Sequence, residues 1–200
     1  MIQLTNCVER FRKVILEELK SNNIKCWIAG GSVRDYFTSG AKISDYDIFF
    51  PNEDEFNKTK KFFTEKNCEI KWESENGMKV VYNKKTFDLV KKFFDSPQKT
   101  IEEFDFTVSM FAVDYDNVYF GESSFIDLSK KQLMINKITY PASTLSRAFR
   151  YNKKGFNICL GEMKKLIESI QDMPKPEITD ENQTEEVTSG DLGGFFLGID

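Results

Sequence analysis

Hydrophobic and polar residues along this chain follow two different periods. In residues 5–22 apolar side chains recur every three to four positions, which predicts an amphipathic helix packed on a neighbouring layer. The same spacing recurs after Asn52, a suitable helix cap, and after Ser96-Pro97, a typical helix start. The predicted helices cover residues 5–22, 52–67, 97–104, 144–151 and 161–171, and a further helix opens at Ser32.

Short apolar or alternating runs separate these helices. Residues 26–29 and 45–50 are the first two predicted strands. Further predicted strands lie at residues 68–72, 78–82 and 86–90, which form an antiparallel meander. A run of apolar residues follows at 105–114, and a turn leads from it into residues 118–120. This order of elements predicts an α/β (α+β) protein, in which helices flank a mixed twisted sheet.

The stretch at residues 27–50 holds the candidate chemistry. A short strand leads into Gly30 and Gly31, a helix start follows at Ser32, and the next strand is acidic. Glycines let a ligand approach the backbone closely, and N–H groups at a helix start favour an anion. Ser32 with Asp35 also fits a capping box, which is the more ordinary explanation of Asp35.

Two aspartates on the second strand predict a metal site. Asp45 and Asp47 are two positions apart and therefore project from the same face of the strand. Neighbouring carboxylates suit hard cations such as Mg²⁺. Asp88 alternates with apolar neighbours on a predicted strand beside the presumed site, with an exposed strand acid as the alternative explanation. The glycines and the acidic pair together indicate a site for a metal-bound phosphate.

Composition narrows the chemistry further. The 200 residues include no histidine, which excludes Ser-His-Asp and Cys-His nucleophiles, histidine-ligated zinc and an imidazole base. The four cysteines are scattered without a CxxC pair, so we expect free thiols rather than disulfides or zinc. No apolar run has the length of a membrane span and no signal peptide is evident, so a soluble, cytoplasmic protein is expected.

Charge is distributed unevenly along the chain. Residues 172–200 hold eight acids against one lysine, and their proline, serine and threonine content predicts a flexible acidic tail. Apolar residues and glycines return at 190–200, a candidate docking segment for a protein partner or for the body of the protein itself. The remainder has 27 basic and 24 acidic residues, a balance compatible with a nucleic-acid substrate.

Two stretches of the chain form a recognisable pair of motifs. The first reads G-G-S-V-R-D at 30–35 and, after nine residues, D-Y-D-I at 45–48. The second reads D-F-T-V-S-M-F-A-V-D at 105–114. In order and spacing they resemble motifs of the class II branch of the polymerase-beta nucleotidyltransferase superfamily, which holds bacterial poly(A) polymerases and CCA-adding tRNA nucleotidyltransferases. The resemblance covers roughly residues 20–155.

This resemblance implies two-metal transfer of a nucleotide from an NTP. Asp45 and Asp47 would hold two Mg²⁺ ions, and Asp88 resembles by position the third acidic residue of the family. An ion pair with an acid of a helix or of the tail is the alternative role of Arg34. The residues implied in nucleotide binding are Gly30, Gly31, Ser32 and Arg34 for the β- and γ-phosphates and Asp105 for the ribose.

The chain departs from the family pattern at two places. Glu103 and Phe104 stand where two arginines usually precede the D-F-T motif. Residues 140–144, Y-P-A-S-T, stand where CCA-adding enzymes carry a base-reading E-D-x-x-R helix. We therefore expect that the protein template for C and A is missing.

A basic cluster follows the second departure. The sequence L-S-R-A-F-R-Y at 145–151 resembles the family's R-x-x-R-F motif. Its Arg147 and Arg150 are candidate contacts to an RNA backbone, with a solvated helix face as the alternative.

The sequence predicts a nucleotidyltransferase head at 1–127, a short helical neck-like extension at 128–171 and a tail at 172–200. The expected activity is Mg²⁺-dependent transfer of a nucleotide to a hydroxyl acceptor, with the 3′ end of tRNA or another RNA favoured. Two alternatives stay open. One is nucleotidylation of a protein or small molecule, and the other is a non-catalytic binding or assembly module of the same fold.

Overall fold

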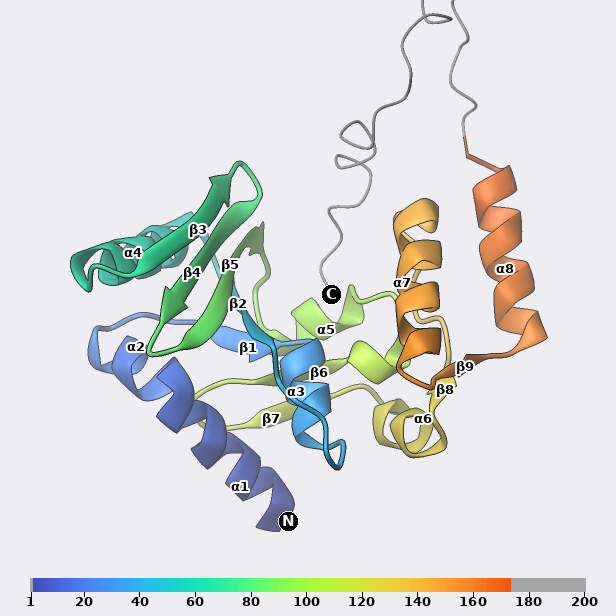
Figure 1. Cartoon of the computed structure of the whole chain (residues 1–200), viewed down its shortest axis with the longest axis horizontal. Coiled ribbons are helices and arrows are strands. Elements are labelled where there is room, and N and C mark those ends of the chain that lie inside the picture. The colour runs from blue at the N-terminus through green and yellow to red at the C-terminus, as the bar shows by residue number, and fades with distance from the viewer. Residues whose placement is uncertain (1, 174–200) are drawn as a thin grey trace, which may run out of the picture.

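A computed structural model describes residues 2–173 of the chain (Figure 1). The predicted acidic tail lies outside the described residues from position 174 onward, and so does its apolar end at 190–200. No helix in the described part has the length and apolar character needed to cross a membrane.

A seven-stranded mixed sheet organises the molecule, as the sequence predicts. Its strand order is β3-β4-β5-β2-β1-β6-β7. The β2–β5 pair is parallel and the other pairs are antiparallel. The strands are β1 (Trp27–Ala29), β2 (Asp45–Phe50), β3 (Glu69–Ser74), β4 (Gly77–Tyr82), β5 (Lys85–Phe93), β6 (Phe111–Val113) and β7 (Val118–Phe120).

Helices cover the sheet on both faces. The N-terminal helix consists of α1 (Ile2–Phe11), a π-helical segment η1 (Arg12–Leu16) and α2 (Glu17–Ser21). It packs with α4 (Glu53–Glu65) on one face, and α5 (Pro97–Glu102) packs on the opposite face. Both predicted caps are confirmed: the Asn52 side chain accepts a hydrogen bond from the Glu55 N–H, and that of Ser96 accepts one from the Lys99 N–H.

Strand alternation assigns each side chain of β2 to one of these faces. Ile48 and Phe50 are buried in the cluster beneath the N-terminal helix and α4. Phe49 is buried on the α5 side, with Trp27 and Ile101. Because side chains alternate along a strand, Asp45 and Asp47 lie on the α5 side, which we call the acidic face. Burial of one face under aromatic residues thus fixes the direction in which the aspartates point.

A separate apolar cluster supports the C-terminal helices. It joins the 3₁₀ turn η2 (Thr107–Ser109) to α6 (Ser124–Lys130), α7 (Pro141–Lys153) and α8 (Leu160–Gln171), with the short strands β8 (Gln132–Leu133) and β9 (Asn157–Ile158). Figure 1 shows α7 and α8 side by side, and α7 is the nearer of the two to α3 (Gly31–Tyr36). The sequence predicts a boundary between the head and the neck-like extension after residue 127. The cluster includes Phe106 and Val108, which lie before this boundary, and the boundary stays a prediction.

The cysteines provide a first test of the packing. We expect a thiol reagent to modify Cys159 rapidly and Cys68 more slowly in the native protein, because the first is exposed and the second half-buried. Cys7 and Cys26 should react only after unfolding. Burial raises the pKa of Cys7 to about 12 and also raises that of Cys26, so neither forms a thiolate near neutral pH. Counting modified thiols by mass spectrometry checks this, and fast native labelling of Cys26 would contradict the packing.

Candidate active site

Three carboxylates lie on the acidic face of two adjacent strands. Asp45 and Asp47 are on β2, and Asp88 of β5 is the direct register partner of Asp47. The Ser44 hydroxyl donates to Asp45 Oδ1 at 2.6 Å. The parallel β2–β5 pairing therefore places the predicted third acid beside the first two, although these strands are about forty residues apart in sequence.

Lys79 compensates this negative charge, and the sequence analysis missed it. It lies on β4 as the register partner of Asp88. Its Nζ is 3.0 Å from Asp88 Oδ2 and 3.8 Å from Asp45 Oδ2. Partial burial lowers the pKa of Lys79, but the hydrogen bond to Asp88 and the charges of the three aspartates raise it, and the net direction is upward. One sequence signal could have identified Lys79. It lies on an alternating strand that is predicted to pair with the strand of Asp88.

The glycine turn before α3 differs in detail from the prediction. Gly30, with φ of 82°, is the N-cap and α3 begins at Gly31, so the predicted start at Ser32 is one residue late. The cap makes no side-chain hydrogen bond, and the capping-box explanation of Ser32 and Asp35 is wrong. A positive φ favours glycine and allows the strand to turn directly into the helix. The Gly30 N–H donates to the Phe111 carbonyl at 2.8 Å, so this amide serves the fold.

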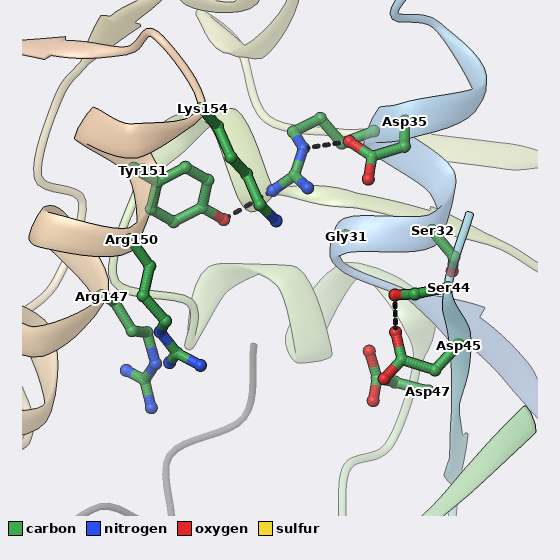
Figure 2. A pocket seen from close by; sticks show the side chains of 11 residues that line it. Gly31, Ser32, Asp35, Ser44, Asp45, Asp47, Arg147, Arg150, Tyr151 and Lys154 are labelled. Atoms are coloured by element: carbon green, nitrogen blue, oxygen red, sulfur yellow. Dashed lines mark hydrogen bonds and ion pairs between the residues drawn. The ribbon is translucent and has the colours of Figure 1, made fainter. Parts of the chain in front are cut away.

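Ser32 is buried at the bottom of this turn. The residue is 4% exposed, and its hydroxyl has no hydrogen-bond partner within the described part of the chain. A buried hydroxyl without a partner is unfavourable, and such groups commonly face a ligand or ordered water. Ser32 and Gly31 line the same cavity as Asp45 and Asp47 (Figure 2).

Arg34 is buried and links α3 to α7 through a hydrogen bond. Its Nε donates to Asp35 Oδ1 at 2.7 Å, and its Nη1 donates to the Tyr151 hydroxyl, also at 2.7 Å. That hydroxyl also shares a hydrogen bond with Ser109 at 2.5 Å. The alternative explanation of Arg34, an ion pair with a helix acid, is thus present. The guanidinium still lines the cavity, and its Nη2 lies 3.4 Å from the position a Cβ at Gly31 would take.

Across the cavity from the acids, α7 presents a basic surface. Figure 2 shows Arg147, Arg150, Tyr151 and Lys154 on one side of the cavity, opposite Asp45 and Asp47. The volume of this cavity is about 140 Å³. The α3 helix is only six residues long, so its dipole contributes little. An anion in the cavity between α3 and α7 would therefore be attracted more strongly by the cationic side chains than by the dipole of α3.

Arg147 has a buried partner. It forms an ion pair with Asp105, and the Thr144 hydroxyl donates to the same carboxylate oxygen of Asp105 at 2.8 Å. The Arg147 side chain is 6% exposed and that of Asp105 10%. The solvated-face explanation is therefore wrong for Arg147.

The departure before Asp105 also has a structural explanation. Phe104 is buried beside α5, where it packs with Phe49, and Glu103 forms an ion pair with Lys137 at 2.7 Å. At the two positions where the family pattern has arginines, Phe104 therefore packs in the core and Glu103 forms a surface ion pair.

A second cavity lies beside the first and shares Arg147 with it. Its volume is about 230 Å³, and its wall includes Val90 and Lys92 of β5 together with Asp105 and Tyr140. Tyr140 is 58% exposed and stands immediately before α7, within the stretch that replaces E-D-x-x-R. An exposed ring and a lysine therefore line this second cavity.

The acidic pair meets the requirements of a Mg²⁺ site that is completed by substrate. Mg²⁺ is usually bound through one or two carboxylates, with waters and substrate phosphates as further ligands. Asp45 and Asp47 supply two neighbouring carboxylates at the cavity wall. Within residues 2–173 no group of three or more acidic, cysteine or histidine side chains is arranged to hold a metal. The ammonium group of Lys79 contacts both Asp88 and Asp45 in this structure.

Comparison with solved structures defines the fold class. A tRNA-processing enzyme in its apo form has a TM-score of 0.63 and 17% identity, over 82% of this chain and 47% of that one. A tRNA nucleotidyltransferase complexed with a primer tRNA and an incoming ATP analog gives 0.60 and 17%, over 78% and 49%. The CCA-adding enzyme of Thermotoga maritima, complexed with tRNA, gives 0.62 and 14%, over 84% and 45%. The protein therefore has a nucleotidyltransferase fold, and it spans less than half the length of these chains.

The family follows from the sequence. Residues 3–131 match the model of the family described as Gad2, Gabija anti-defense 2 family protein. The match covers more than half of the chain, which therefore belongs to the Gabija anti-defense 2 family. Comparison with curated proteins gives no match.

The Asp105–Arg147 pair gives a stability prediction. Replacing Arg147 with Met leaves a buried carboxylate without its main cation, so we expect the free energy of unfolding to fall by about 3–5 kcal/mol. The double variant Asp105→Asn/Arg147→Met should lose less. Arg150→Met on the exposed side of the same helix is the control and should change stability by less than about 0.5 kcal/mol. Urea denaturation measures all three, and equal losses in both arginine variants would refute a structural role of the pair.

Proposed function

We propose that this protein transfers a nucleotide from an NTP to a hydroxyl acceptor with the help of Mg²⁺. The observation that carries the proposal is one cavity, also lined by Arg34, in which Arg150 and Lys154 lie opposite Asp45 and Asp47 (Figure 2). Acids and cations on opposite walls suit a ligand that is itself anionic and metal-bound. A nucleoside triphosphate with Mg²⁺ has this character.

In this proposal Asp45 and Asp47 are the metal ligands. Bound there, two Mg²⁺ ions would activate the acceptor hydroxyl and stabilise the triphosphate. The acceptor oxygen forms a bond to the α-phosphorus, the bond from that phosphorus to the bridging oxygen breaks, and pyrophosphate leaves. Asp88, beside Asp47, is proposed to assist as a further ligand or to accept the hydroxyl proton. Lys79 contacts Asp88 Oδ2 in this structure and therefore competes with either role at that oxygen.

The chain's own donors would hold the nucleotide. Gly30 makes the turn that presents the next residues to the cavity, and Gly31, the hydroxyl of Ser32 and the guanidinium of Arg34 are proposed to contact the β- and γ-phosphates. Arg150 and Lys154 line the same cavity, so they are proposed to neutralise phosphate charge as well. Asp105 is proposed to bind the ribose, as the resemblance implies. It lines the second cavity, and one of its carboxylate oxygens contacts Arg147 and Thr144.

The second cavity is proposed to receive the base of the incoming nucleotide. Tyr140 offers a ring for stacking, which every base tolerates, and the E-D-x-x-R template is absent from its position. This favours weak discrimination among NTPs. Arg147 stands between the two cavities, and Arg150 is proposed to reach the RNA backbone or the triphosphate from the rim.

An RNA 3′ end, with tRNA as one candidate, is the favoured acceptor. The fold neighbours crystallised with tRNA support this choice, as does the mildly basic charge of residues 1–171. A second candidate is nucleotidylation of a protein or small molecule. The family description favours it, because an anti-defense protein can act by modifying a component of its opponent. A non-catalytic module is the outcome that the following experiment separates from both.

The experiment follows label from each α-labelled NTP into total cellular RNA, protein and small molecules in the presence of Mg²⁺. We expect the wild-type protein to label one class of acceptor and the Asp45→Asn/Asp47→Asn variant to lose this by at least about a hundredfold, because both metal carboxylates are gone. Asp54→Asn, at an exposed acid of α4, is the matched control.

The acceptor that receives the label decides between the two enzymatic candidates. Label in none of the three classes, although the NTP binds in equilibrium dialysis, would overturn the catalytic proposal. The protein would then be a nucleotide-binding module.

Lys79 gives a prediction about metal removal. Lys79→Met leaves three neighbouring carboxylates without their ammonium partner, so the melting temperature in EDTA should fall by several degrees, and added Mg²⁺ should restore it. The wild type should gain less from Mg²⁺ because Lys79 already compensates the acids. Lys61→Met, at an exposed lysine of α4, is the control for loss of a positive charge. Equal Mg²⁺ responses in wild type and Lys79→Met would show that Lys79 and the metal do not share the site.

A further inference from the structure

A row of side chains extends from the acidic pair across the sheet. In register, Asp47 of β2 is opposite Asp88 of β5, Asp88 is opposite Lys79 of β4, and Lys79 is opposite Trp72 of β3. Residues directly opposite each other on neighbouring strands share a face of the sheet. The contacts of Lys79 with Asp88 and Asp45 confirm this for the inner members of the row. Trp72 therefore lies on the acidic face, three strands from Asp47.

A β-bulge puts Trp72 on that face. The register of β3 against β4 shifts between Ile70 and Trp72, so Ile70 is opposite Val80 and Trp72 is opposite Lys79. Without the extra residue, Ile70 and Trp72 would project from the same face. The ion pair of Glu73 with Lys60 of α4 places Glu73 on the covered face and agrees with this assignment. The bulge thus turns one aromatic residue of an exposed edge strand toward the site.

The distance suits a substrate that extends away from the metal ligands. Three strand spacings of about 4.8 Å separate Asp47 from Trp72, roughly 14 Å in all. A stacked nucleic-acid strand advances about 3.4 Å per nucleotide, so roughly four nucleotides of the acceptor strand span this distance. Trp72 is 42% exposed, so part of this residue is accessible to a ligand.

We propose that Trp72 is a stacking platform for a base of the acceptor strand, about four nucleotides from its 3′ end. The inference rests on the proposed function, because it assumes that the acceptor hydroxyl lies at Asp45 and Asp47. An aromatic side chain in line with the metal carboxylates suits a nucleobase, since base stacking on aromatic rings tolerates every sequence. Trp72 then contributes to acceptor affinity and register, and it takes no part in the transfer step.

Intrinsic fluorescence provides a binding test that needs no catalysis. The chain has two tryptophans, and Trp27 is 1% exposed with its indole N–H bonded to Thr100, so it gives a constant background. Titration of the full chain with octaadenylate RNA, without NTP, should quench the Trp72 emission. An octamer with an abasic site at the fourth position from the 3′ end should quench less than one with an abasic site at the 5′ end.

Matched variants on the same strand complete the test. We expect Trp72→Ala to weaken octamer binding, measured by fluorescence anisotropy of labelled RNA, between about fivefold and a hundredfold. Trp72→Phe should retain most of the affinity, and Ile70→Ala, at an exposed residue on the opposite face, should leave it unchanged. In transfer assays Trp72→Ala should raise the KM for the acceptor and leave kcat and the KM for NTP near their wild-type values.

The outcomes separate this inference from the proposed function. Unchanged octamer affinity in Trp72→Ala, or an equal loss in Ile70→Ala, overturns the platform even if nucleotide transfer occurs. Failure of the wild type to bind the octamer also overturns the platform. That result would favour a protein or small-molecule acceptor. Quenching that depends on Trp72, in a protein that transfers no nucleotide, upholds the platform and refutes only the enzymatic proposal.

Discussion

The parallel pairing of β2 with β5 is the constraint on which the site depends. It brings Asp88 into register with Asp47 and, through the antiparallel β4 and β3, extends the same row to Lys79 and Trp72. The pairing is held by burial on the opposite face, where Ile48, Phe50, Phe87 and Leu89 pack beneath α4 and the N-terminal helix. A slip of one residue in this register would turn the aspartates toward that apolar cluster, where unpaired charge is costly.

The second requirement is that α7 stays against α3. Arg34 and Tyr151 join the two helices through a buried hydrogen bond, and Asp105 forms an ion pair with Arg147 in the middle of α7. These contacts keep the cations of α7 across the cavity from the acids on β2. Charges of opposite sign on facing walls are stable without a ligand because most have local partners, such as Lys79 for the acids. A charged substrate would replace some of these partners, which makes the site suited to an anion that brings its own cations.

Much of this arrangement was predictable from sequence because it depends on local patterns. The alternation of β2, the caps at Asn52 and Ser96 and the meander before Asp88 all have short-range signals, and the structure confirms them. Non-local partners had no such signal. The Arg34–Tyr151 bond joins residues 117 positions apart, and burial of Arg147 depends on its contact with Asp105 across 42 positions. The Ser32 capping box failed because a glycine with positive φ already ended the strand.

The central claim, nucleotidyl transfer at the Asp45–Asp47 pair, is tested most directly with ATP labelled differently at its α- and γ-phosphorus atoms. We predict that, with Mg²⁺ and the acceptor, the α-label becomes covalently attached to the acceptor while the γ-label appears in pyrophosphate. The labelled acceptor and the labelled pyrophosphate should form in equal amounts, and neither product should form without the acceptor. Appearance of the γ-label as inorganic phosphate, with the α-label remaining in free nucleotide, would show hydrolysis and contradict the account.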